Sequence, residues 1–253
     1  MSTDLDNIEV RPARRSFLKA SAAMAATVIA PGILLYKTGQ AKSPDAAVDS
    51  SVRWGLLIDS NALDEADVDA CVSACQKEHG WKNSGNETDA QWIRKLKLTD
   101  PQSGHVKFLP MMCQHCENPP CVDVCPTGAS FKRADGIVLV NKHTCIGCRY
   151  CMMACPYKAR SFIHENLKDQ LAVAPRGKGT VESCTLCVHR IDRDGENAVP
   201  ACAEAVNRGE HKPILFGDLN NPDSEISQRL RELGGTRLRA DMGLNPGLRY
   251  QGL

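Results

Sequence analysis

The sequence predicts an α+β fold organised around clustered cysteines rather than around one large apolar core. Eleven of the thirteen cysteines fall into three tight groups along the chain. A short motif recurs, because residues 125–131 are echoed by residues 155–162. Aromatic residues make up only 5% of the chain. The repeat predicts two similar halves, each consisting of a loop, a short helix and a strand.

The first two cysteine groups have spacings that carry chemical information. They read Cys113-x2-Cys116-x4-Cys121-x3-Cys125-Pro126 and Cys145-x2-Cys148-x2-Cys151-x3-Cys155-Pro156. The second is the bacterial ferredoxin spacing, in which three thiolates hold one [4Fe–4S] cube and the fourth reaches the neighbouring cube. The cationic irons must draw these thiols into the thiolate form, since a free cysteine has a pKa of about 8.5. The spacing therefore predicts an electron carrier with several iron–sulfur clusters.

Zinc is the alternative from another class, because pairs of C-x2-C knuckles also build zinc sites with four cysteine ligands. In that reading the chain would be a zinc-stapled periplasmic binding module. Zinc has no use for a further cysteine three residues later, nor for the proline that follows it. A disulfide framework is disfavoured, because small secreted disulfide domains are shorter and less regularly spaced.

The N-terminal residues 1–41 predict export by the twin-arginine route. Arg14-Arg15-Ser16-Phe17-Leu18-Lys19 precedes an Ala-rich apolar stretch, and residues 39–41 form a small-x-small cleavage site. A transmembrane anchor is disfavoured, because Pro31 and Gly32 interrupt a stretch that is already short. We expect the twin-arginine translocase to export the folded, metal-loaded protein to the periplasm. There it would be peripheral on a membrane complex.

Between the signal and the last cysteine, the local patterns predict few regular elements. Residues 54–59 and 136–141 read as strands. Residues 79–111 form an insertion that is polar and irregular as far as residue 104, with Trp81 and Trp92 as its packing anchors.

The C-terminal residues 217–253 predict a helix and an extended tail. Asp223 or Ser224 caps a helix that carries Ile226, Leu230 and Leu233 on one face and stops at Gly234-Gly235. Residues 236–253 read as extended.

Charge excludes one class of partner. The 31 Lys and Arg residues nearly balance the 30 Asp and Glu residues, giving a net charge of +1. No basic face therefore argues for nucleic acid. We also find no nucleophile–base pair, phosphate loop or dinucleotide fingerprint, so no independent active site is predicted.

On its cysteine motifs, the chain resembles the four-cluster ferredoxin-type subunits of bacterial membrane oxidoreductases, such as those of dimethyl sulfoxide, polysulfide and nitrite reductases. The resemblance implies two dicluster ferredoxin-like modules with pseudo-twofold symmetry. The inner module is residues 112–163, and the outer one joins residues 52–78 to residues 180–216.

The resemblance also implies crossed pairing of the cysteines. Cluster A then has the ligands Cys113, Cys116, Cys121 and Cys155. Cluster B has the ligands Cys145, Cys148, Cys151 and Cys125. Cluster C has the ligands Cys184, Cys187, Cys202 and Cys75.

The family's fourth cube has lost its ligands in this chain. Three of its four cysteine positions are Glu65, Val68 and Val206. Three complete sites use twelve of the thirteen cysteines, so Cys71 is predicted to be a non-ligand, a buried free thiol. The alternative is that Cys71 binds a different metal together with Asp64, Glu65 or Asp67.

Other side chains near the cluster loops are expected to act without binding iron. His115 and His143 are assigned supporting or surface roles, because every cube already has four sulfurs. Four side chains are expected to shield the cubes from water: Tyr150, Tyr157, Ile146 and Val122.

A narrower resemblance rests on the export signal, the three-cube pattern and residues 216–224. These are similar to the periplasmic iron–sulfur subunits of DsrMKJOP-type transmembrane complexes in sulfate reducers and sulfur oxidisers. The resemblance implies two partners, a multihaem c-type cytochrome and a multispanning quinone-interacting membrane subunit. Electrons would pass between the quinone pool and the haems. The alternative within redox chemistry is an electron-transfer subunit of a molybdopterin oxidoreductase.

Overall fold

The computed structural model describes residues 48–168 and 170–253, which belong to one structural unit. The signal predicted for residues 1–41 therefore lies outside the described residues.

Strand β1 (Trp54–Asp59) is the centre of a three-stranded sheet. β8 (Ile214–Asp218) pairs with β1 in antiparallel register and β9 (Leu248–Gln251) in parallel register. The sheet is covered on both faces, which explains the unbroken apolar run from Leu56 to Ile58.

The C-terminal tail is extended, but it is part of the core. β9 lies beside β1, and Tyr250 within it is fully buried. Helix α7 (Glu225–Leu233) begins at Ser224, whose hydroxyl accepts a hydrogen bond from the amide of Ser227 at 3.3 Å. Ile226 packs against Leu57 and Leu215 of the sheet. Leu233, predicted on the same face, is exposed instead.

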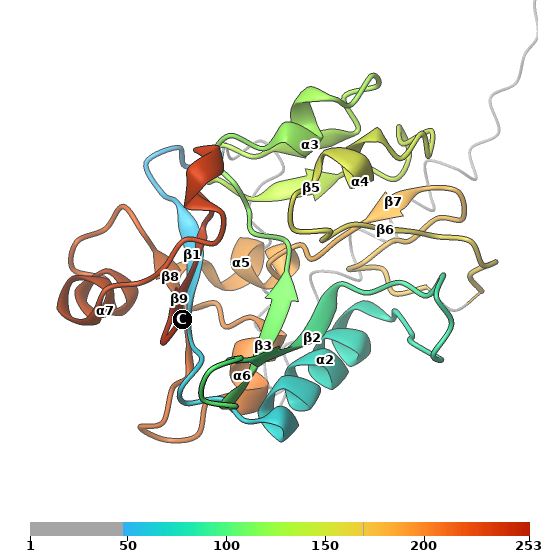
Figure 1. Ribbon diagram of the computed structural model, residues 1–253. Helices are drawn as coiled ribbons and strands as arrows, with labels where there is room; N and C mark the ends of the chain where they lie inside the picture. Colours follow the sequence, from blue (N-terminus) through green and yellow to red (C-terminus); the bar gives the residue numbers. More distant parts are fainter. Residues whose placement is uncertain (1–47, 169) are drawn as a thin grey trace, which may run out of the picture. The chain divides into compact units, whose positions relative to one another are not determined.

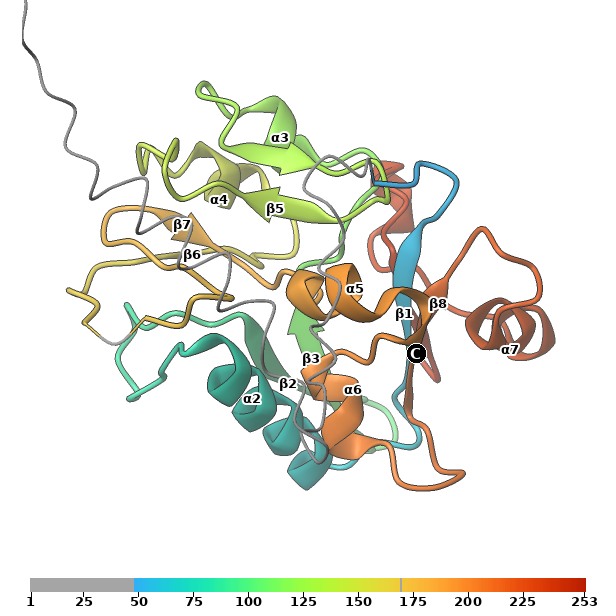
Figure 2. The same cartoon turned by 180° about the vertical axis from the view of Figure 1, so that it is seen from behind.

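The segment that carries Glu65, Val68, Cys71 and Cys75 forms one continuous helix, α2 (Glu65–His79). Asp64 and Asp67 make a capping box at its start, and Gly80 ends it in the left-handed conformation at φ 69°. The buried face carries residues at spacings of three and four: Val68, Cys71, Cys75 and His79. This face packs against α6 (Ala201–Val206), which lies beside α2 in both views (Figure 1, Figure 2).

The region predicted as an irregular insertion contains a regular hairpin. β2 (Ile93–Thr99) pairs antiparallel with β3 (Val106–Met112), from Ile93 opposite Met112 to Thr99 opposite Val106. Trp81 and Trp92 are both buried. Apolar and basic residues alternate over part of β2, as in a strand with one buried face, but the basic residues gave the segment the composition of a loop.

The two cysteine-proline segments have the same local structure. A short helix, α3 (Pro120–Asp123), precedes the first, and α4 (Tyr150–Ala154) precedes the second. Three residues after the cysteine, Gly128 and Lys158 both have positive φ, at 65° and 52°. Each segment then enters a two-stranded ladder, either β4–β5 (Ser130–Lys132 and Val138–Val140) or β6–β7 (Ser161–Phe162 and Val181–Glu182). Helix α5 (Val188–Asp194) and two 3₁₀ turns, Gly195–Asn197 and Ala240–Met242, complete the described elements.

No helix among the described residues is both long and apolar enough to cross a membrane.

Candidate metal centres

Site A comprises Cys113, Cys116, Cys121 and Cys155. Cys113 and Cys116 follow β3, Cys121 lies in α3, and Cys155 ends α4; all four are buried. Burial, together with the neighbouring Cys121 and Cys155, raises the pKa of the Cys113 thiol to about 12. The same three influences raise the pKa of Cys116 to about 12. The structure therefore brings the four sulfurs within electrostatic reach of one another.

Site B comprises Cys145, Cys148, Cys151 and Cys125. Burial raises the pKa of Cys151, and the neighbouring Cys145 and Cys125 add to the rise. Cys125 itself differs: burial would raise its pKa, but hydrogen bonds from Ser130 and Thr127 outweigh burial and lower it. Cys148 lies in the loop between Cys145 and Cys151 and is exposed. Site B is thus the one that reaches the surface.

Site C comprises Cys184, Cys187, Cys202 and Cys75, from the segment before α5, from α6 and from α2. All four are buried. Burial raises the pKa of Cys202 well above its ordinary value, and Cys71, Cys187, Cys184 and Cys75 each add to the rise. Cys75 also adds to the raised pKa of Cys184, and Cys187 adds to that of Cys75. Cys75, distant in the sequence, therefore lies near the other three.

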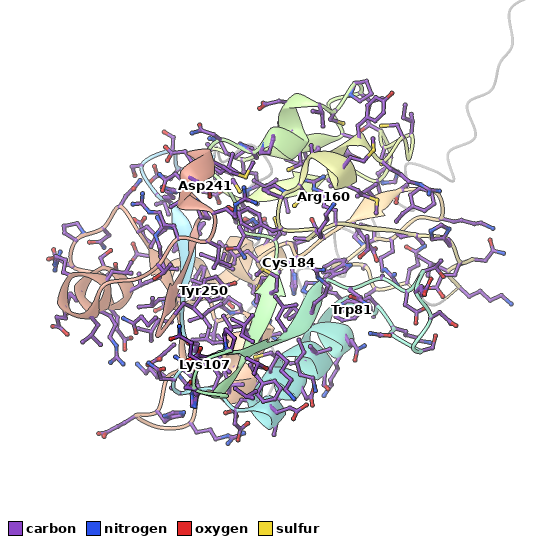
Figure 3. The ribbon with its side chains drawn as sticks, in the orientation of Figure 1. Trp81, Lys107, Arg160, Cys184, Asp241 and Tyr250 are labelled. Carbon is purple, nitrogen blue, oxygen red and sulfur yellow. The ribbon has the colours of Figure 1, made fainter. Side chains whose placement is uncertain are left out.

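Site A is close enough to each of the other two sites to affect them electrostatically. Cys113 of site A adds to the raised pKa of Cys184 in site C. Cys151 of site B adds to the raised pKa of Cys121 in site A. Figure 3 shows Cys184 in the interior of the fold.

The three C-x2-C loops turn in the same way. The residue before the second cysteine is His115, Gly147 or Leu186, and each has positive φ, at 43°, 69° and 55°. At Gly147 the reason is also steric, since a Cβ there would lie 2.1 Å from the carbonyl oxygen of Gly179. The same left-handed turn therefore recurs in all three loops.

Most of the sulfurs accept hydrogen bonds from N–H groups. Backbone amides point at Cys125, Cys145, Cys155, Cys184 and Cys187, with N···S distances between 3.3 and 3.5 Å. A neutral thiol is only a weak acceptor, whereas a thiolate is a strong one. With all-sulfur donor sets and amides aimed at the sulfurs, the residues fit [4Fe–4S] clusters. Because the buried thiols would otherwise hold their protons, iron binding must release those protons.

Three side chains that touch these sulfurs were missed from the sequence. His79 Nε2 lies 3.4 Å from Cys187 Sγ, and Trp81 Nε1 donates to Cys75 Sγ at 3.3 Å. Arg160 Nη2 donates to Cys121 Sγ at 3.1 Å. No local pattern marks His79 or Trp81. Arg160 could have been noticed, because it places a charged side chain at the position where the other copy of the repeat has the uncharged Ser130.

Helix packing fills the region of the lost fourth site. Val68, Cys71 and Val206 are buried between α2 and α6. Glu65 forms an ion pair with Lys95 at 2.9 Å instead of facing Cys71. Cys71 Sγ donates to the carbonyl oxygen of Cys202 at 3.4 Å. Among residues 48–168 and 170–253, no group of three or more His, Cys, Asp or Glu side chains is arranged to hold a single metal ion.

Other predicted side chains divide into buried and exposed. His115 is buried and its Nδ1 accepts from the amide of Val138 at 3.1 Å, whereas His143 is exposed. Tyr157 is buried, and its hydroxyl donates to the carbonyl oxygen of Leu238 at 3.0 Å. Ile146 and Tyr150, expected to shield a cube, are 67% and 55% exposed. That part of the shielding prediction is wrong for the chain alone, because the loop turns these two side chains outward.

Comparison with known proteins gives a consistent result. A family model described as a 4Fe-4S dicluster domain matches residues 104–212. The chain is 42% identical to the iron–sulfur subunit 1 of the Hdr-like menaquinol oxidoreductase of Archaeoglobus fulgidus, over 94% of this chain and 97% of that protein. It is 38% identical to a sulfite dehydrogenase subunit of Allochromatium vinosum, over 77% of this chain and 81% of that protein. Protein NrfC of Escherichia coli is 35% identical, over 93% of each chain.

Proposed function

The chain belongs to the family of 4Fe–4S ferredoxin-type electron-transfer subunits, and from that premise we propose that it relays electrons through three [4Fe–4S] clusters held at sites A, B and C. The observation that carries the proposal is the set of three four-cysteine groups, in which site A is electrostatically coupled to both of the others. Each cluster, when bound, accepts and donates one electron. Two modules with pseudo-twofold symmetry are part of the proposal, supported by the repeated turn at Gly128 and Lys158.

The residues of the chain hold and tune the clusters in this scheme. Four cysteines bind each cube, and the amides aimed at their sulfurs stabilise the more negative, reduced state. Burial of sites A and C excludes water. Site B reaches the surface at Cys148, which supports it as the point of electron exchange with a partner protein.

For the complex in which the chain works, we propose a DsrMKJOP-type assembly, with this chain in the position of the DsrO subunit. Its partners would be a multihaem c-type cytochrome and a multispanning quinone-interacting membrane subunit. Support comes from the relative in Archaeoglobus fulgidus, whose name describes a menaquinol oxidoreductase. Its similarity covers nearly the full length of both chains.

A second candidate is the electron-transfer subunit of a molybdopterin oxidoreductase. It is favoured by 43% identity to a protein of Halobacterium salinarum named as a putative dimethyl sulfoxide reductase iron–sulfur subunit, over 78% of each chain. Purification of the chain with its native partners separates the two. Haem c and no molybdenum in the complex would support the first candidate, whereas molybdenum would support the second.

The clusters themselves are tested by iron and sulfide analysis of the protein reconstituted without oxygen. Three [4Fe–4S] clusters require about twelve irons and twelve sulfides per chain, and the protein should be brown. A colourless protein containing zinc would overturn the proposal. A content near sixteen irons would mean that the fourth site is filled after all.

Export is proposed on the sequence of residues 14–19. Replacing both Arg14 and Arg15 with Lys should retain the protein in the cytoplasm, because the twin-arginine translocase reads that pair. Cell fractionation and immunoblotting measure the outcome. If the double variant still reaches the periplasm, the export proposal is wrong.

A further inference from the structure

Arg160 is a buried cation that has no carboxylate partner among the described residues. Its side chain is on the interior of the fold (Figure 3), and the residue is 5% exposed. Nη2 donates to Cys121 Sγ of site A at 3.1 Å, and the guanidinium also interacts electrostatically with Cys151 of site B, whose pKa it lowers. Nη1 is buried and has no hydrogen-bond partner in the protein.

A second buried arginine shows what is missing. Arg176 is equally buried, but it forms a two-pronged ion pair with the buried Glu182, at 2.9 and 2.8 Å. That is the usual arrangement, because an arginine removed from water needs an anion beside it. Around Arg160 the groups that supply negative charge are sulfurs of Cys121, Cys113 and Cys151.

The sulfurs can neutralise the positive charge of Arg160 only when they are thiolates. Burial favours the protonated thiols of Cys113 and Cys121, and Arg160 opposes that effect at both. A bound cluster with four thiolate ligands would provide the lasting negative charge that this guanidinium lacks.

From these contacts we propose that Arg160 is a positioning residue shared by sites A and B, where its fixed positive charge raises the reduction potentials of both clusters relative to the cluster at site C. The inference rests on the proposed presence of clusters at these sites. An electron added to a cluster adds negative charge, and a buried cation that contacts one ligand sulfur and acts electrostatically on others stabilises that state. Water does not screen the interaction, because the guanidinium is buried.

Site C offers an internal comparison. The side chains of His79 and Trp81 contact its sulfurs, and neither carries a guanidinium. Trp81→Phe removes the N–H donated to Cys75 and should lower only the potential of the site C cluster. Arg160→Gln should lower the other two. The two variants together therefore separate the signal of the site C cluster from the signals of the clusters at sites A and B.

The experiment is a potentiometric titration of the full, reconstituted chain, followed by low-temperature electron paramagnetic resonance. Arg160→Gln is expected to shift two of the three clusters to lower potential and to leave the third unchanged. Arg160→Lys keeps the positive charge, so the two potentials in this variant should stay close to those of the wild type. Arg193→Gln, which removes a charge that is 62% exposed, is the control and should move none.

Each result decides the matter. Three clusters with unchanged potentials in Arg160→Gln, or an equal shift of all three, would overturn the inference and leave the proposed function standing. A wild-type chain without cluster signals would instead overturn the proposed function. If Arg160→Gln loses iron, the lysine variant decides: full iron content in Arg160→Lys supports a role of the charge, and equal loss in both contradicts it.

Discussion

At the scale of single residues, the spacing of the cysteines predicted that they bind iron–sulfur clusters, but it did not predict which other side chains contact their sulfurs. The three groups were readable because cluster ligands need fixed offsets in the chain. Arg160 meets the sulfur of Cys121, which lies 39 positions away in the sequence, and Trp81 meets Cys75 across the end of α2. Such contacts depend on how the elements pack, and no local pattern encodes them.

Cys71 and Cys75 provide the sharpest test at this scale, because they are buried one turn apart on the same face of α2. Cys71→Ala should retain all three clusters and lower the free energy of unfolding by only about 1 kcal/mol, the value of one small apolar group. Cys75→Ala should lose the cluster at site C or convert it to a three-iron form. Iron content and electron paramagnetic resonance measure both. Equal damage from the two substitutions would contradict the assignment of Cys75 as the ligand.

At the scale of elements, two strands and the C-terminal helix were predicted from the sequence, whereas helix α2, the β2–β3 hairpin and the pairing of β9 were not. Residues 54–59 were readable as a buried strand from an apolar run. Helix α2 was missed, because Glu65, Val68, Cys71 and Cys75 were interpreted only as present or lost ligand positions. The role of β9 could not be read either, since its pairing with β1 joins residues nearly two hundred positions apart.

The end of α2 is fixed to α5 by Glu78, and this contact predicts a pH dependence. Its carboxylate accepts from Arg190 at 2.7 Å and lies 2.6 Å from His189 Nε2. The hydrogen bond from Arg190 lowers the pKa of Glu78 from 4.5 to about 2. A lowered pKa in the folded state means that the contribution to stability is complete above about pH 5 and is lost as the pH falls toward 2.

Glu78→Gln should therefore be less stable than the wild type by about 1 kcal/mol at pH 7, a value reduced by partial exposure of the pair. The deficit should be constant between pH 6 and 8 and should shrink below about pH 4.5. Urea unfolding without oxygen, monitored by circular dichroism across this range, measures it. Lys212, whose ion pair with Glu225 is exposed, supplies the control: Lys212→Gln should change stability little at any pH. A deficit for Glu78→Gln that grows in acid would contradict the assigned role.

At the scale of the whole molecule, the three sites differ in their access to solvent. All thirteen cysteines lie among the described residues, and Cys148 of site B is the only one that is exposed. The loop and helix around it present Ile146, Tyr150 and Met153, which are 67%, 55% and 68% exposed. Neighbouring apolar side chains over a redox centre suit contact with a partner protein. Sequence patterns could not reveal this surface, because the same residues were equally compatible with shielding a cluster from within.

Met153 permits a direct test of that surface. Met153→Glu places a carboxylate in the apolar patch, and desolvating it on docking should cost more than about 1.4 kcal/mol, which corresponds to at least a tenfold weaker interaction. In membranes that contain the proposed complex, electron flow between the quinone pool and the haems should fall, whereas reduction of the purified chain by methyl viologen and the cluster potentials should remain unchanged. Leu233→Glu is the matched control, because Leu233 is 62% exposed on α7, which packs on the sheet rather than on a cluster loop. Loss of activity in both variants would indicate general damage, and unaffected flow in Met153→Glu would show that electrons enter or leave the chain elsewhere.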